Sequence, residues 1–100
     1  MDFFEKENNG FIDIVKYVSS NRGGEYVLVF NNRKIHCKFE SMYESDNGYE
    51  IVEDEYEQYF VLEFYNIDSL MPFELSYHNV PNEVYHNGRL IFSIKDHKFN

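Results

Sequence analysis

The stretch Tyr26-Val-Leu-Val-Phe-Asn-Asn-Arg-Lys-Ile-His-Cys-Lys-Phe39 predicts a β-hairpin around which the rest of the chain is arranged. Its first strand is apolar on both faces, because large apolar side chains at even positions alternate with Val27 and Val29, so we expect it to be central or covered by a helix. Asn31-Asn32 is a plausible two-residue turn, since Asn tolerates positive φ. After the turn, apolar and polar residues alternate, which predicts a second strand with one face in solvent.

The residues before this hairpin predict one short amphipathic helix. Its apolar side chains recur at i, i+3, i+4 and i+7, at Phe11, Ile14, Val15 and Val18. Asn9 can cap its start, and Gly23-Gly24 can end it. A helix of about ten to twelve residues is marginal alone, so we expect it to pack on a sheet.

The residues after the hairpin predict further antiparallel strands joined by short turns. A short strand is expected around Tyr49 and Ile51, and a longer one from Glu57 to Ile67. Met71-Pro72 is expected to interrupt the pattern, a third strand to alternate from Phe73 to Tyr77, and Asn87-Gly88 to form a type I′ hairpin turn. The predicted fold is α+β: one domain over residues 1–100, with an N-terminal helix packed on a strongly bent antiparallel sheet or small barrel of about six strands.

Composition favours a small cytoplasmic domain without a cofactor. The chain of 100 residues contains 10 Phe and 9 Tyr, enough large rings to form one core. Its one cysteine, Cys37, cannot form an internal disulfide. We expect neither a signal peptide, because the first residues lack a positive start followed by an apolar run, nor a membrane span, because no apolar run is long enough. The four histidines lack the spacing of a metal site, and no nucleophile or phosphate-loop motif is present. We therefore expect no metal, no cofactor and no enzyme activity.

The distribution of charge is the main functional signal. Residues 39–88 contain twelve Asp or Glu and no Lys or Arg, whereas the rest of the chain has six acids and nine Lys or Arg, for a net charge of −9. Nucleic acids and anionic membranes would be repelled, so the expected partner is a basic protein. Tyrosines between the acids offer contact area at low entropic cost. The predicted partner-binding residues are Tyr43, Glu44, Asp46, Tyr49, Glu50, Glu53, Asp54, Glu55, Tyr56 and Glu57.

Two acidic, tyrosine-rich segments, Met42-Tyr-Glu-Ser-Asp-Asn-Gly-Tyr-Glu50 and Glu55-Tyr-Glu-Gln-Tyr-Phe60, carry a resemblance to a known class of proteins. In character, over roughly residues 40 to 67, the chain resembles the small immunity proteins of bacterial polymorphic-toxin systems. The resemblance implies a stoichiometric inhibitor that covers the active site of a toxin domain, often a basic nuclease. We expect the chain itself to be a monomer or weak homodimer. It assigns no residue roles.

Two other classes of function fit the same residues. The chain could be a structural or regulatory module that self-associates through strand edges and surface aromatics, its acidity serving solubility alone. It could also be a small hydrolase or sugar-binding domain, which would require a concave pocket containing at least two carboxylates.

Overall fold

The computed structural model of the chain describes residues 10–46 and 58–95, which form one helix, six strands and a short 3₁₀ helix. In chain order these elements are α1 (Phe11–Ser20), β1 (Tyr26–Phe30), β2 (Arg33–Asp46), β3 (Gln58–Asn66), β4 (Met71–Leu75), η2 (Tyr77–Asn79), β5 (Glu83–His86) and β6 (Arg89–Ser93). The predicted strand around Tyr49 and Ile51 lies outside the described residues.

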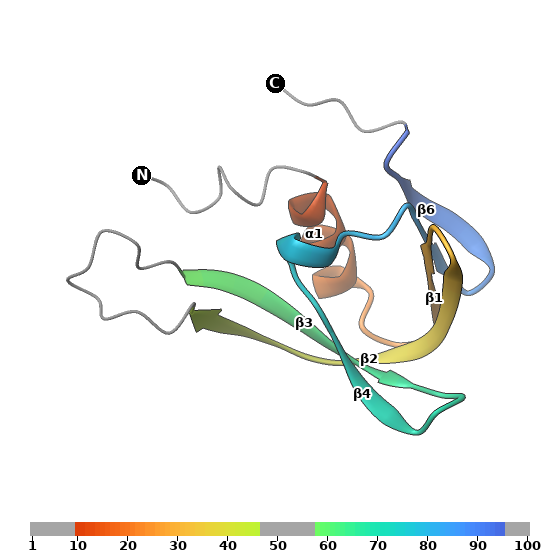
Figure 1. Cartoon of the computed structure of the whole chain (residues 1–100), viewed down its shortest axis with the longest axis horizontal. Helices are drawn as coiled ribbons and strands as arrows, with labels where there is room; N and C mark the ends of the chain where they lie inside the picture. Colours follow the sequence, from red (N-terminus) through yellow and green to blue (C-terminus); the bar gives the residue numbers. More distant parts are fainter. Residues whose placement is uncertain (1–9, 47–57, 96–100) are drawn as a thin grey trace.

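The six strands form one antiparallel sheet in the order β4-β3-β2-β1-β5-β6. The sheet curves around α1 without closing into a barrel (Figure 1). The curvature is strong enough for the rings of Phe30 on β1 and Phe73 on β4 to stack with their centroids 5.9 Å apart, although β2 and β3 lie between those strands. The bent-sheet form of the prediction is therefore confirmed.

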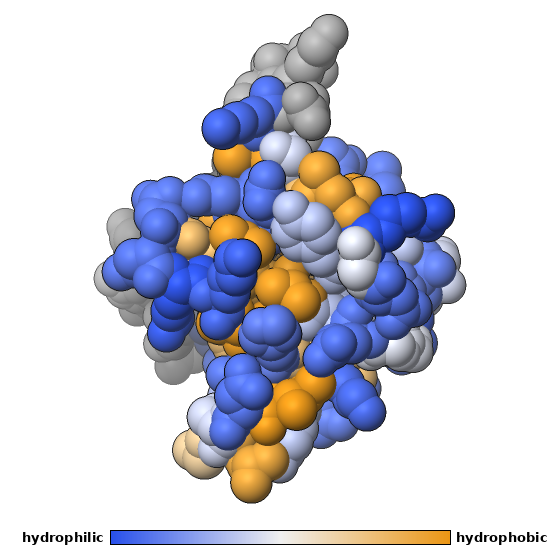
Figure 2. Space-filling view, turned by 90° about the vertical axis from the view of Figure 1, so that its right-hand side faces the viewer, coloured by the Kyte–Doolittle hydropathy of each residue, from blue (hydrophilic) through white to orange (hydrophobic). Residues whose placement is uncertain are grey.

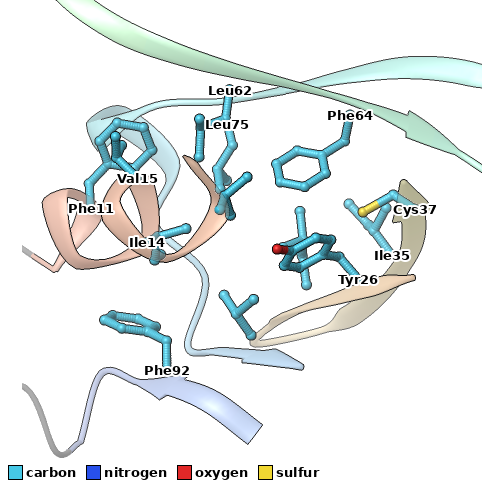
Figure 3. Packing of buried hydrophobic residues seen from close by; sticks show 13 residues of the cluster. Phe11, Ile14, Val15, Tyr26, Ile35, Cys37, Leu62, Phe64, Leu75 and Phe92 are labelled. Carbon is cyan, nitrogen blue, oxygen red and sulfur yellow. The ribbon is translucent and has the colours of Figure 1, made fainter. Parts of the chain in front are cut away.

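The core lies between α1 and the concave face of the sheet. The four helix residues predicted from their spacing are all buried, and Phe11, Ile14 and Val18 have no exposed surface. They pack with apolar side chains from the strands, among them Tyr26, Leu28, Ile35, Cys37, Leu62, Phe64, Leu75 and Val84 (Figure 3). Burying each large apolar side chain stabilises the fold by about 1.5–3 kcal/mol, so this cluster holds the short helix on the sheet.

Both predicted two-residue turns are present, but one forms for a different reason. Phe30 pairs with Arg33, which leaves Asn31 and Asn32 as the turn. Neither asparagine has a positive φ, since Leu70 and Asn87 are the non-glycine residues in the described chain that do. Asn87 (φ 51°) and Gly88 (φ 83°) do adopt the left-handed conformation that a type I′ turn requires.

Several predicted boundaries are wrong. The helix is preceded by Gly10 with no side-chain cap, and it ends at Ser20, before the glycines are reached. The next residue, Asn21, donates its N–H to the Val18 carbonyl. Pro72 lies inside β4 instead of interrupting the pattern, because an edge strand has one side on which no N–H is needed. The strand predicted from Phe73 to Tyr77 corresponds to β4, which ends at Leu75, and Tyr77 belongs to η2.

A β-bulge in β2 decides which side chains face outward. Phe39 pairs with Phe64 and Ser41 pairs with Glu63, so Glu40 is the extra residue. Before the bulge the odd positions Ile35 and Cys37 face the core, but after it the even position Met42 packs against the core. The bulge thus turns Tyr43 to the outer face of the sheet, away from α1.

Candidate functional site

The far end of the β2–β3 hairpin is the candidate site, and we call it the acidic arm. It comprises residues 40–46 of β2, residues 58–63 of β3 and Glu74 of β4, and it contains no Lys or Arg. The arm extends away from β1 and β6, on the left in Figure 1. Its carboxylates are those of Glu40, Glu44, Asp46, Glu63 and Glu74.

On the outer face of the arm, two hydroxyl groups hydrogen-bond two neighbouring carboxylates. The Tyr43 hydroxyl donates to Glu74, and the Ser41 hydroxyl donates to Oε1 of Glu63 over 3.2 Å. Glu63 and Glu74 are directly opposite each other on β3 and β4, a position in which like charges repel. Tyr43 is 38% exposed. The strand pairing therefore presents two adjacent negative charges beside an exposed aromatic ring.

The electrostatic surroundings keep Tyr43 protonated. Its hydrogen bond to Glu74, together with partial burial and the nearby negative charge of Glu74 and Glu63, raises the pKa of Tyr43 to about 12. The hydroxyl is therefore a neutral donor across the physiological range. Because Glu74 accepts that bond with one of its oxygens, its remaining lone pairs are available to an incoming donor.

The other two described members of the predicted site lie on the opposite face of the arm. Glu44 pairs with Phe60 and Asp46 pairs with Gln58, and both acids are exposed. By strand alternation they project to the same side as Met42, whereas Tyr43 projects to the other. The structure therefore places Tyr43, Glu44 and Asp46 on one arm but divides them between its two faces.

The remaining seven predicted residues lie outside the described part of the chain. They are Tyr49, Glu50, Glu53, Asp54, Glu55, Tyr56 and Glu57, in the segment that joins β2 to β3. The described residues contain nine Asp or Glu and seven Lys or Arg, a net charge of −2, so most of the net charge of −9 lies elsewhere in the sequence. Residues 47–57 alone contain five acids and no Lys or Arg.

Sequence reasoning missed Ser41, Glu63 and Glu74 as parts of the site. Glu63 and Glu74 are eleven positions apart and meet through the pairing of β3 with β4, and Ser41 reaches Glu63 through the bulged pairing of β2 with β3. The absence of Lys and Arg from residues 39–88 was the one sequence signal that covered the positions of Glu63 and Glu74.

Two hollows elsewhere on the molecule do not contain paired carboxylates. The larger, of about 460 Å³, has Glu83 as its one carboxylate and also includes Val29, Phe30, Asn31, Asn82, Ser93, Ile94 and Lys95. The smaller, of about 350 Å³, is lined by Tyr17, Asn21, His86, Asn87 and Arg89. Neither has the pair of carboxylates that a sugar-hydrolysing site needs. The described residues thus lend no support to that hypothesis.

His86 connects three segments of the fold. Its Nδ1 lies 2.9 Å from the Tyr17 hydroxyl, and its Nε2 lies 2.7 Å from the carbonyl oxygen of Gly23. The carbonyl can accept but not donate, so Nε2 carries the proton. The ring also stacks on Tyr26, with centroids 4.4 Å apart. These contacts join α1 and the α1–β1 segment to β5, which is a structural role.

The cysteine is also part of the core. Cys37 has no exposed surface, and burial, aided by the negative charge of Glu25, raises the pKa of its thiol to about 12. A thiol with this pKa contributes little thiolate for catalysis or metal binding. Among the described residues, His, Cys, Asp and Glu form no group of three that could hold a metal ion.

Comparison with protein-family models, curated proteins and solved structures finds no match to the chain. None of the helices in residues 10–46 and 58–95 is long and apolar enough to cross a membrane.

Proposed function

We propose that this chain is a protein-binding domain that uses the acidic arm to bind a basic partner protein. The observation that supports this most directly is the combination of five carboxylates with no Lys or Arg in the acidic arm, four on the β2–β3 hairpin and one on β4. Self-repulsion among these charges opposes folding, so their accumulation favours a role in binding over a purely structural one. The exposed ring of Tyr43 beside Glu63 and Glu74 is the expected anchor.

The carboxylates of the arm and the ring of Tyr43 would contribute to different steps of binding. The negative field of the arm would accelerate encounter with a positively charged surface, by one or more orders of magnitude at low salt. Tyr43 would slow dissociation, because its ring buries apolar area while its hydroxyl stays satisfied by Glu74. Basic side chains of the partner would pair with Glu63 and Glu74 on one face and with Glu44 and Asp46 on the other.

The more specific proposal is an immunity-type inhibitor in the bacterial cytoplasm. In this version the partner is a toxin or nuclease domain whose basic active-site region is covered by the arm. Its support is the acidic, tyrosine-containing character of residues 40–67. A gene for a large secreted protein with a basic C-terminal domain, next to the gene for this chain, would strengthen it.

The test compares two triple variants with the same change in charge. One replaces Glu44, Glu63 and Glu74 by Gln, and the control replaces Glu25 and Glu83 by Gln and Asp68 by Asn, outside the arm. Immobilised protein is used to capture partners from extract of cells that carry the gene, and the captured protein is identified by mass spectrometry. We expect a basic protein whose association rate falls roughly tenfold with the arm variant and less than about twofold with the control.

The same experiment can reject the proposal. An acidic partner, or one whose binding is unaffected by both the arm variant and added salt, would contradict it. Sedimentation of the protein alone over a range of salt concentrations addresses the alternative of self-association. Oligomers that persist at high salt would favour association through apolar strand edges.

A further inference from the structure

Arg33 is held over two aromatic rings at the opposite end of β2 from the acidic arm. Its Cζ lies 5.7 Å from the ring centroid of Phe30 and 5.7 Å from that of Phe73. Because the two rings are stacked on each other, the guanidinium rests on a rigid support. Arg33 is exposed, and no carboxylate in residues 10–46 and 58–95 contacts it. Its N–H donors are therefore pre-positioned and free to bind an acceptor.

Next to Phe73, the turn between β3 and β4 exposes two large apolar side chains. Leu70 is 65% exposed and Met71 is 61% exposed. Leu70 also has a φ of 61°, a conformation that is unfavourable for a bulky residue. The side chain of Asn66 stabilises the turn by accepting hydrogen bonds from the N–H groups of Asp68 and Ser69, at 2.9 and 3.1 Å. The turn thus holds apolar groups in solvent at a cost in backbone strain, an arrangement that points to binding.

The wider surface around Arg33 carries apolar patches among polar residues and includes a hollow. Figure 2 shows this side of the molecule, where apolar side chains gather at the centre of the face and at the bottom, over the β3–β4 turn. Phe30, which supports Arg33, also lines the hollow of about 460 Å³, together with Ile94 and Lys95. Aromatic residues, Met and Arg are the types enriched in the centres of protein interfaces.

The charge of this surface identifies the partner's chemistry. Arg33 is the cation that β2 contributes to this face, since Lys34 and Lys38 project to the other face, and Lys95 lies beside the hollow, which has Glu83 as its single carboxylate. We propose that this surface, formed by Phe30, Arg33, Leu70, Met71 and Phe73, binds a segment of a partner protein that carries a carboxylate next to an apolar side chain. Arg33 binds the carboxylate, and the aromatic and turn residues contact the apolar group.

A protein segment fits this surface better than a lipid bilayer or a second copy of the chain. The net charge of −9 opposes approach to an anionic membrane, and it equally opposes association of two copies. The surface is distinct from the acidic arm, since Arg33 lies at the other end of β2 and Phe73 projects to the face of β4 opposite to that of its neighbour Glu74. The chain therefore has two surfaces that select partners of opposite sign.

The test selects binders from a random peptide library displayed on phage, with the full chain as the target. We expect the selected peptides to share an Asp or Glu adjacent to an aromatic or aliphatic residue. With a synthetic peptide of the selected sequence, R33Q should weaken binding by at least about tenfold, the loss typical of one charged hydrogen-bonding pair. The matched control is K34Q, which makes the same change in charge on the opposite face of β2 and should change affinity less than about twofold.

Two further variants complete the test. M71S should also weaken binding without lowering the melting temperature, because Met71 is exposed in the free protein. The triple arm variant E44Q/E63Q/E74Q should leave peptide affinity unchanged, so failure of this inference can be distinguished from failure of the proposed function.

Several results would overturn the inference. These are no enriched peptide, enriched peptides without an acid, or equal affinity of R33Q and the unmodified chain. If no peptide is enriched, and the chain binds phosphatidylserine vesicles but the R33Q variant does not, the surface would be assigned to a membrane. A dimer in sedimentation that R33Q dissociates would assign it to self-association.

Discussion

The two halves of β2 differ in the burial of their side chains and in the sign of their charged residues. Before the bulge, Ile35 and Cys37 are 5% and 0% exposed and face α1, and the charged residues are Arg33, Lys34 and Lys38. After the bulge, Tyr43 is 38% exposed and the charged residues are all acids. One continuous strand thus anchors the core with its first half and presents carboxylates with its second. Substitution of the buried residues in the first half should therefore affect stability, and substitution of the exposed residues in the second half should affect binding of the basic partner.

The strongest test of this difference is F64A. Phe64 is fully buried opposite Phe39, and its ring makes edge contacts with Tyr26 and Phe39 at 5.7 Å. Removing the ring should lower the free energy of unfolding by about 3–5 kcal/mol, measured by urea denaturation. Y43A, in the arm, should cost less than about 1 kcal/mol. Equal losses for the two variants would show that the arm is as important to stability as the core.

A smaller effect is expected from G24A. Gly24 has a φ of 89°, and a Cβ there would lie 2.6–2.9 Å from side-chain atoms of Asn87 and His86. We expect a loss of about 1–3 kcal/mol, from backbone strain and displacement of the His86 side chain. G23A is the matched control, because a Cβ on Gly23 would meet no atom within 4 Å, and it should change stability by less than about 0.5 kcal/mol. Thermal or urea unfolding that fails to separate the two variants would refute the predicted clash.

Y17F should cost about 1 kcal/mol, the usual contribution of one hydrogen bond. The substitution removes the hydroxyl 2.9 Å from Nδ1 of His86 and leaves the ring contact in place. Urea denaturation measures the loss, and imidazole NMR signals report whether His86 keeps its Nε2 proton. An unchanged stability would mean that the bond to Gly23 and the stacking on Tyr26 suffice to hold His86.

The smallest change in stability is expected from Y43F. The pKa of Tyr43 is raised from its ordinary value of 10.0 to about 12 in the fold. The stabilisation linked to this shift is therefore complete below about pH 10 and is lost as the pH rises toward 12. Ultraviolet titration of the folded protein should show a tyrosine step displaced toward pH 12 that Y43F removes, while the late ionisation of Tyr26 and Tyr85, whose pKa values burial and Glu83 respectively raise, remains. Y43F should leave stability at pH 7 nearly unchanged. A titration curve that is identical in the variant would contradict the hydrogen bond to Glu74.

The sequence predicted those parts of the fold that depend on local pattern. Helical spacing identified Phe11, Ile14, Val15 and Val18, and Asn87-Gly88 identified its turn from the left-handed conformation that both residues accept. The bulge at Glu40 has no such local pattern, because it arises from the pairing of two strands that are distant in sequence. Continued alternation from Ile35 would have placed Tyr43 on the core side.

The candidate site was predicted less completely than the fold, for the same reason. A deficit of Lys and Arg over fifty residues located the acidic region, but not which side chains share a face. Tyr43, Glu63 and Glu74 come together through the pairings of β2 with β3 and of β3 with β4. Arg33 was recognised as basic, but its position over Phe30 and Phe73 depends on curvature that brings β1 toward β4.

The extra residue in β2 also has an evolutionary consequence. Loss of the single codon for Glu40 would remove the bulge and restore regular alternation from Phe39 to Ser41, with the same residues of β3 opposite the strand beyond it. Tyr43 would stay on the outer face, and Glu44 and Asp46 would stay on the opposite face, because Glu40 is the residue that the pairing skips. A descendant of this protein could thus lose one codon here without redirecting its recognition surface.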